Sequence, residues 1–195
     1  MVLYFGATND PAHIRGALSY IESADYLKGI GIEEESYLAQ IFYRYGENVA
    51  AYERILDLTR PGKERREYPE VSYSVIAAIV TGMMGVEVVE DGAAGHPLVR
   101  TISRLQTKSE TAALRGLSIR QNLVDLEHRG DRSSTLTNRS GDTIHWQAAF
   151  SGKIPALMVN GNPVSARLSF DAVHAPVSSI VIEVPVGATV SVSRP

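Results

Sequence analysis

The first half of the chain repeats apolar side chains every three or four positions, which is the spacing of amphipathic helices. Asp10 followed by Pro11 is a helix start, because aspartate caps a first turn and proline fits its first position. Glycines then interrupt the pattern at 29 and 31, at 46 and at 62. The pattern therefore predicts helices beginning at Pro11 and covering about 32–45, 47–58 and 71–84.

The last predicted helix differs from the two before it. Positions 71–84 are apolar nearly all round, which is typical of a helix that is buried on most sides. The helix at 47–58 instead carries one stripe of Val49, Tyr52 and Leu56, with charges on a flank. The last three helices thus alternate as inner, outer and inner, which predicts a toroid of helical hairpins. A small helical bundle would show similar amphipathicity and is the alternative.

The second half consists of short runs of β-forming residues separated by turn residues. Apolar and polar side chains alternate at 144–148 and 180–184, and Asn160-Gly161 is a dipeptide favoured in tight hairpins. The predicted strands are 117–126, 134–137, 143–150, 156–159, 166–170, 179–184 and 189–192. We therefore predict an α+β protein: a helical region over 1–90, a linker with the first strands over 91–116, and an antiparallel β-sandwich over 117–195.

Composition excludes several classes of protein. The 195 residues include no cysteine, which excludes a disulfide scaffold, a thiol nucleophile and a cysteine zinc site. A net charge of −3 gives no reason to expect nucleic acid, and no apolar run is long enough for a transmembrane helix. The first residues lack the features of a signal peptide, so we expect a cytoplasmic protein, or an exported one whose signal lies upstream.

Candidate chemistry is concentrated in carboxylates and tyrosines. The five histidines are scattered without ligand spacing, so no metal site is expected, and nucleophile-elbow, P-loop and dinucleotide motifs are absent from the sequence. Acids and tyrosines gather at two loop-to-helix junctions, 31–37 and 63–73. Because these junctions open the two inner helices, we expect them at the same end of the helical layer. Carboxylates can protonate a glycosidic oxygen and activate water, and tyrosine rings stack on sugars.

Structural explanations compete for each of these residues. The glutamates at 33–35 and Glu70 lie in first helical turns, where the macrodipole alone favours them. Glu67 precedes its helix and can pair with Arg65 or Arg66. Tyr37 and Tyr73 can equally be core residues.

The two junctions resemble the late hairpins of (α/α)6-barrel glycoside hydrolases, the six-hairpin glycosidases. The resemblance is carried by Gly31-Ile-Glu-Glu-Glu-Ser-Tyr-Leu38 and by Arg66-Glu-Tyr-Pro-Glu-Val-Ser-Tyr73, which is similar to the start of the last inner helix of the toroid. The β half, with Trp146-Gln-Ala-Ala-Phe150, looks like the β-sandwich that follows the barrel in bacterial members.

This resemblance implies glycoside hydrolysis by a general acid and a general base, usually with inversion and without a metal or organic cofactor. It implies Glu67 or Glu70 as the base, with Asp57 and Glu64 as alternatives. Glu34 is the matching candidate in the earlier loop. The side chains expected to bind the carbohydrate substrate are Tyr68, Tyr73, Tyr37 and Arg66.

The predicted toroid is incomplete, because twelve helices need about 350 residues or more. The chain is therefore expected to be a fragment, a subunit completed by another chain, or an inactive remnant. We expect exposed inner-helix surface at Ile76, Ile79 and Met83, to be covered by the missing N-terminal hairpins, a partner chain or a second copy. A non-catalytic carbohydrate-binding or assembly module is the alternative function, and a helical scaffold without a sugar role is the third.

Overall fold

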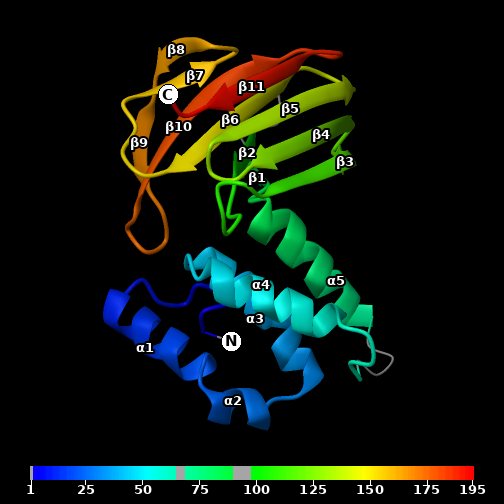
Figure 1. The fold of residues 1–195 in the computed structure, drawn as a ribbon, viewed down its shortest axis with the longest axis vertical. Coiled ribbons are helices and arrows are strands. Elements are labelled where there is room, and N and C mark those ends of the chain that lie inside the picture. The colour runs from blue at the N-terminus through cyan, green and yellow to red at the C-terminus, as the bar shows by residue number, and fades with distance from the viewer. Residues whose placement is uncertain (1, 65–68, 90–97) are drawn as a thin grey trace. The chain divides into compact units, whose positions relative to one another are not determined.

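The computed structural model describes residues 2–64, 69–89 and 98–195 (Figure 1). Helices come first and two largely antiparallel sheets follow, which confirms the predicted α+β class with a C-terminal β-sandwich. The chain divides into two compact units, Met1–Met83 and Met84–Pro195, which we call the helical unit and the β unit.

The helical unit contains a helix that the sequence pattern misses. Its elements are α1 (Pro11–Ile21), α2 (Ala24–Gly29), α3 (Ile32–Arg44), α4 (Asn48–Thr59), α5 (Pro69–Ala77) and a π-helical segment, η1 (Ala78–Met83). The six residues of α2 are too few to show a helical period. A cap stabilises this short helix, since Ser23 Oγ accepts a hydrogen bond from the Tyr26 N–H at 3.2 Å.

The predicted start of α1 is confirmed. The Asp10 carboxylate accepts hydrogen bonds from the backbone N–H groups of Ala12 (2.7 Å) and His13 (3.2 Å). Pro11 follows at the first helical position, where its missing N–H leaves no bond unmade.

Helix α3 is the centre of the helical unit, and both α4 and α5 pack against it. Its buried side chains include Leu38, Ile41 and Phe42. The first residues of the chain also lie on α3: Arg44 Nη1 donates to the Tyr4 carbonyl at 2.6 Å, and the Tyr45 hydroxyl donates to the Leu3 carbonyl at 3.2 Å. These contacts make α3 the central helix of the helical unit.

Helix α4 buries a different stripe from the one that the sequence pattern identifies. Its core residues are Ala51, Ile55 and Leu58. Val49 and Leu56, from the predicted stripe, are 58% and 51% exposed. Both stripes have helical spacing, so periodicity alone could not distinguish them.

The prediction that the last helix is buried on most sides is wrong for α5. Val71 and Val75 pack in the helical core, but Tyr73 is 69% exposed and Ile76 57% exposed. Of the predicted exposed surface, only Ile76 is fully open, because Ile79 and Met83 are partly buried against the core.

The β unit is a sandwich of two sheets. The strands are β1 (Glu87–Val89), β2 (Leu98–Ile102), β3 (Thr111–Ile119), β4 (Asn122–Arg129), β5 (Ser133–Ser140), β6 (Ile144–Ser151), β7 (Ala156–Val159), β8 (Asn162–Ser165), β9 (Arg167–Phe170), β10 (Pro176–Val184) and β11 (Thr189–Ser193). One sheet has the order β1-β2-β6-β10-β9, and the other β3-β4-β5-β11-β7-β8. The pairing is antiparallel except between β2 and β6.

The predicted alternation in β6 and β10 is the register of the sandwich core. Trp146 on β6 lies opposite Ile182 on β10, and Ile144 lies opposite Val184. Trp146 is fully buried, and its Nε1–H donates to Thr101 Oγ1 at 2.9 Å. The only tryptophan of the chain is therefore a core residue with a satisfied hydrogen bond.

The sequence predicts the turn of one hairpin but not the turn of another. Asn160 and Gly161 form the predicted tight turn between β7 and β8, with φ of 48° and 84°. The predicted strand at 117–126 is wrong, because Arg120 (φ 53°) ends β3 and β4 begins at Asn122. Arginine is uncommon at positive φ, so nothing in the composition indicates this turn.

Candidate functional site

The amino-terminal ends of α3 and α5 lie at the same end of the helical unit. Near these ends, Ser36 Oγ donates to Ser74 Oγ at 3.3 Å. Further along, Gly82 in η1 lies against the ring of Tyr43 on α3. Contacts that advance by similar numbers of residues on both helices mean that α3 and α5–η1 run parallel. This agrees with the predicted placement of the two acidic junctions.

Glu34 lies in the first turn of α3 with an exposed side chain. Its carboxylate folds back over the amino-terminal residue Gly31, where an added Cβ would lie 2.8 Å from Glu34 Oε2. A negative charge at this position interacts favourably with the α3 macrodipole. Glu34 is thus solvent-accessible at the helix mouth and stabilised there by the helix itself.

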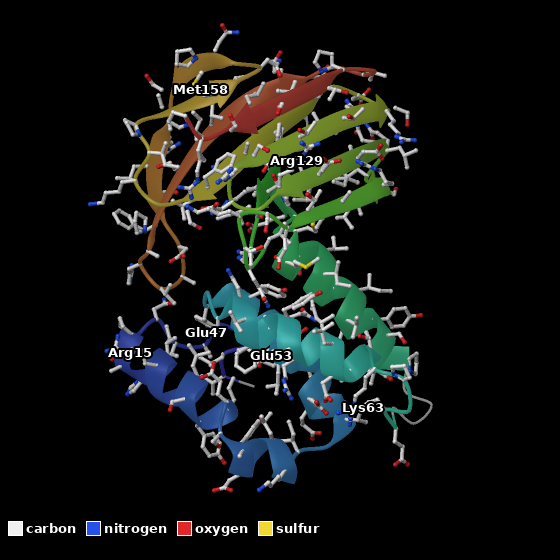
Figure 2. All side chains as sticks on the ribbon, in the orientation of Figure 1. Arg15, Glu47, Glu53, Lys63, Arg129 and Met158 are labelled. Carbon is white, nitrogen blue, oxygen red and sulfur yellow. The ribbon has the colours of Figure 1, made fainter. Side chains whose placement is uncertain are left out.

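A cluster of ion pairs lies beside Glu34 and joins three segments of the chain. Lys63 Nζ bonds Glu35 Oε2 at 2.8 Å, Glu35 Oε1 at 3.0 Å and Asp57 Oδ2 at 2.5 Å. Glu35 belongs to α3, Asp57 to the last turn of α4, and Lys63 to the connection that leads toward α5. Figure 2 labels Lys63 within the helical unit. We call Glu35, Asp57 and Lys63 the lysine cluster.

Two arginines complete the surroundings of the lysine cluster. Arg54 Nη1 lies 3.5 Å from Glu35 Oε1, and Arg60 Nε lies 3.0 Å from Asp57 Oδ1. The side chains of Lys63, Glu35 and Asp57 are only 15%, 13% and 26% exposed. Each carboxylate therefore has two cationic partners in a largely dehydrated position.

The electrostatics of the lysine cluster favour its charged form. The hydrogen bond from Lys63 lowers the pKa of Asp57, against the opposing effect of burial. Burial lowers the pKa of Lys63, but its hydrogen bonds to Asp57 and Glu35 outweigh this and raise it. A carboxylate with a lowered pKa is a weak base, and both oxygens of Asp57 are paired with cations. This argues against Asp57 as the alternative general base and favours an anchoring role for the cluster.

The remaining candidates differ in accessibility. Glu70 is exposed in the first turn of α5, and Tyr73, 69% exposed, lies one turn further on. Glu64 is also exposed. Tyr37 is half-buried, and its ring meets that of Tyr4 edge-on at 5.0 Å, as expected for a packing residue.

Glu67, Tyr68 and Arg66 lie outside the described residues. Among the described candidates, Glu34 and Glu70 meet the requirement of two reachable carboxylates at one end of parallel helices. Such a pair can hold sugar hydroxyls and supply a base to a water molecule.

The sequence interpretation missed the lysine cluster as a unit. Its members are separated by 28 residues (Glu35 to Lys63) and by 6 residues (Asp57 to Lys63). One sequence feature could have indicated part of the cluster: Lys63 follows the Pro61-Gly62 turn, which returns the chain toward the end of α4. A cation is favoured at that helix end.

A buried serine–histidine pair lies in the β unit. His128 Nδ1 lies 2.7 Å from Ser134 Oγ, and His128 Nε2 lies 3.0 Å from the Met84 carbonyl. Both side chains are buried, His128 at 0% and Ser134 at 1% exposure. A nucleophile must reach its substrate, so this pair is a structural element of the sandwich.

Within residues 2–64, 69–89 and 98–195, no group of three or more histidine or acidic side chains is placed to hold a metal ion. The helices of this part of the chain all fall short of the length and apolarity needed to cross a bilayer. No family model matches the chain, and no curated protein matches it.

Proposed function

We propose that the chain is the carboxyl-terminal portion of a glycoside hydrolase that acts on oligo- or polysaccharide by carboxylate acid–base chemistry. Glu34 and Glu70, together with Glu67, are the proposed reactive carboxylates, and Tyr73 the proposed sugar-stacking ring. Alone, the portion binds sugar weakly and hydrolyses it at the background rate. The opposing acid belongs to the missing hairpins or to a partner chain.

The observation that carries the proposal is the parallel course of α3 and α5–η1. The Ser36–Ser74 hydrogen bond lies near the amino-terminal ends of both helices, which supports a shared site for Glu34 and Glu70. The lysine cluster supports the proposal further, because it ties the connection after α4 to α3 at that same end. Carboxylates on anchored backbone suit acid–base work, which depends on geometry.

The alternative, a carbohydrate-binding module built on the sandwich, lacks a supporting observation. Sugar platforms rely on exposed aromatic rings. All nine tyrosines precede the β unit, Trp146 is buried within it, and one exposed ring, Phe170 on β9, is too few for a stacking platform.

The test is oligosaccharide binding by the whole chain, found on a glycan array and measured by calorimetry. We expect Glu34→Gln and Glu70→Gln each to weaken binding at least tenfold. The control Glu87→Gln changes an exposed glutamate on β1 and should leave binding unchanged. Equal binding by all four proteins would overturn the proposal.

An assay for newly formed reducing ends tests whether the chain alone lacks the general acid. Turnover above background by the chain alone, abolished by Glu67→Gln or Glu70→Gln, would refute the claim that an opposing acid is missing. Turnover that survives both substitutions would refute the assignment of the carboxylates.

A further inference from the structure

One edge of the sandwich lacks the protection that sheet edges usually carry. Edges are normally blocked by a proline, a bulge or a very short strand, because an open edge pairs with other strands. In the described part of the chain, β8 carries Pro163, β3 has a bulge between Leu114 and Leu117, and β1 has only three residues. Strand β9 ends its sheet with neither a proline nor a bulge (Figure 1). Its side chains Leu168 and Phe170 are 48% and 59% exposed.

The backbone groups of Leu168 and Phe170 point away from the sheet. In an antiparallel pair, residues that exchange hydrogen bonds with the neighbouring strand alternate with residues that do not. The Asp171 N–H donates to the Ala175 carbonyl at 3.0 Å, and the pairing of β9 with β10 continues this register. Ser169 therefore bonds to β10, whereas the N–H and C=O groups of Leu168 and Phe170 face the open edge.

Two β9 strands can use these groups in one antiparallel register. Leu168 of each copy then lies opposite Phe170 of the other copy, and both pairs exchange two hydrogen bonds. Ser169 lies opposite itself on the two-fold axis. A shift of this register in one direction would need the N–H of Ala166, which is already bonded within the chain. A shift in the other direction would need Ala172, which lies in the turn that leads to β10.

The same register brings complementary side chains together. Leu168 lies beside Phe170 of the second copy on one face of the sheet, and Arg167 lies beside Asp171 of the second copy on the other face. Arg167 is exposed and has no ion-pair partner among the described residues. Asp171 uses only Oδ1 to accept from two N–H groups of its own turn, which leaves Oδ2 for a cation. The edge is thus complementary to its own reversed copy, as a two-fold interface requires.

We propose that β9 is the dimerisation edge of this chain, where a second copy adds its own β9 in antiparallel orientation around Ser169. The two five-stranded sheets then form one continuous sheet. A strand of another sequence would have to offer a carboxylate to Arg167 and a cation to Asp171 at the matching positions, so the charges select a second copy. The short edge predicts a reversible dimer at the small end of interface sizes. This inference does not depend on sugar chemistry.

The first experiment is sedimentation velocity of the whole chain over a hundredfold range of concentration, where we expect a monomer–dimer equilibrium. Arg167→Glu places like charges opposite Asp171 and should weaken dimerisation at least tenfold. Leu168→Pro removes an N–H that faces the open edge and should abolish it. The control Arg132→Glu reverses an exposed arginine between β4 and β5 and should leave the dimer unchanged. Circular dichroism and Trp146 fluorescence confirm that each variant is folded.

The second experiment tests the register and uses the absence of cysteine from the chain. Ser169→Cys puts two thiols opposite each other at a separation that a disulfide can bridge, so mild oxidation should give a covalent dimer. Ser140→Cys changes a more exposed serine on β5 and should stay monomeric. A chain that is monomeric at every concentration, or a dimer that survives both Arg167→Glu and Leu168→Pro, would overturn the proposal. Equal cross-linking of the two cysteine variants would overturn the register.

Discussion

At the residue scale, His128 shows how burial sets a protonation state. The Met84 carbonyl can only accept, so His128 Nε2 carries the proton and Nδ1 accepts from the Ser134 hydroxyl. Burial lowers the pKa of His128 to about 4, although the bond to Met84 opposes the shift. The neutral ring is therefore the folded form at neutral pH.

This protonation state makes the stability of the β unit acid-sensitive. An unfolded histidine titrates near 6.5, so between pH 6.5 and 4 the unfolded chain binds the proton and the folded chain does not. The free energy of unfolding is then expected to fall by about 3 kcal/mol across this window. His128→Gln keeps a donor and an acceptor but cannot titrate. Urea unfolding at pH 7, 6, 5 and 4 should show that the free energy of unfolding falls less for the variant than for the wild type. An equal fall in both proteins would contradict the assignment of His128 as the titrating group.

Gly82 is the second residue whose identity the structure explains. An added Cβ would lie 2.5 Å from Tyr43 Cδ2 and 3.0 Å from Tyr43 Cγ. Tyr43 is 1% exposed, so its ring has little room to move. Only glycine allows η1 to approach α3 this closely.

Gly82→Ala should therefore destabilise the helical unit by about 1–3 kcal/mol through overpacking. Thermal denaturation followed by the tyrosine signal measures the loss. Gly29→Ala is the matched control, because nothing lies within 4 Å of its added Cβ and α2 would gain helix propensity. Equal effects of the two substitutions would show that the Tyr43 contact is not the cause.

At the element scale, the lysine cluster joins α3, α4 and the segment that follows α4. Removing the ammonium group leaves two mostly buried carboxylates facing each other without their shared partner. Each carboxylate keeps its arginine, but the two negative charges lose the cation that lies between them, so their repulsion and their burial are less well compensated.

Lys63→Met should lower the free energy of unfolding by about 1–3 kcal/mol at pH 7, discounted for partial exposure. Lys28→Met, which changes an exposed lysine of α2, should stay within about 0.5 kcal/mol of the wild type. Because the pKa of Asp57 is lowered in the folded protein, its stabilising effect is present above the unfolded pKa and is lost as the pH falls. The difference in free energy of unfolding between wild type and Lys63→Met should thus become smaller from pH 6 to pH 3. A difference that does not change with pH would contradict an electrostatic origin of the destabilisation.

Element prediction succeeded where the signal was local. The Asp10-Pro11 cap, the glycine breaks and the Asn160-Gly161 turn each depend on a few neighbouring residues. The turn at Arg120 and the helix α2 were missed, because an arginine at positive φ and a six-residue helix leave no readable pattern.

At the scale of the whole molecule, the two units have separate spectroscopic reporters. All nine tyrosines lie at or before Tyr73 in the helical unit, and Trp146 is the only tryptophan and lies in the β unit. Near-ultraviolet circular dichroism of tyrosine and fluorescence of tryptophan can therefore follow the two cores separately.

We expect the two units to unfold as separate cooperative transitions, since each has its own buried core. Gly82→Ala should lower the midpoint of the tyrosine signal by about 4–8 °C per kcal/mol and leave the Trp146 midpoint unchanged. A common shift of both midpoints would show that the units unfold together.

The candidate site illustrates the limit of sequence reasoning. The sequence predicts that the junctions of Glu34 and Glu70 share one end of the helical unit, since parallel inner helices begin together. It does not predict the lysine cluster, because ion pairs across 28 residues depend on which faces of α3 and α4 meet. Nor does it reveal which of two apolar stripes α4 buries.

Sequence alone determined the local features of this protein: where helices start, which strands alternate, and where glycine and asparagine turn the chain. These follow from backbone sterics and from the spacing of neighbouring side chains. Only the tertiary structure decided that Lys63 links Glu35 to Asp57, that Trp146 is buried, and that Val49 and Leu56 face outward. Such outcomes depend on long-range packing, where the burial of one face leaves another exposed, and periodicity carries no information about that choice.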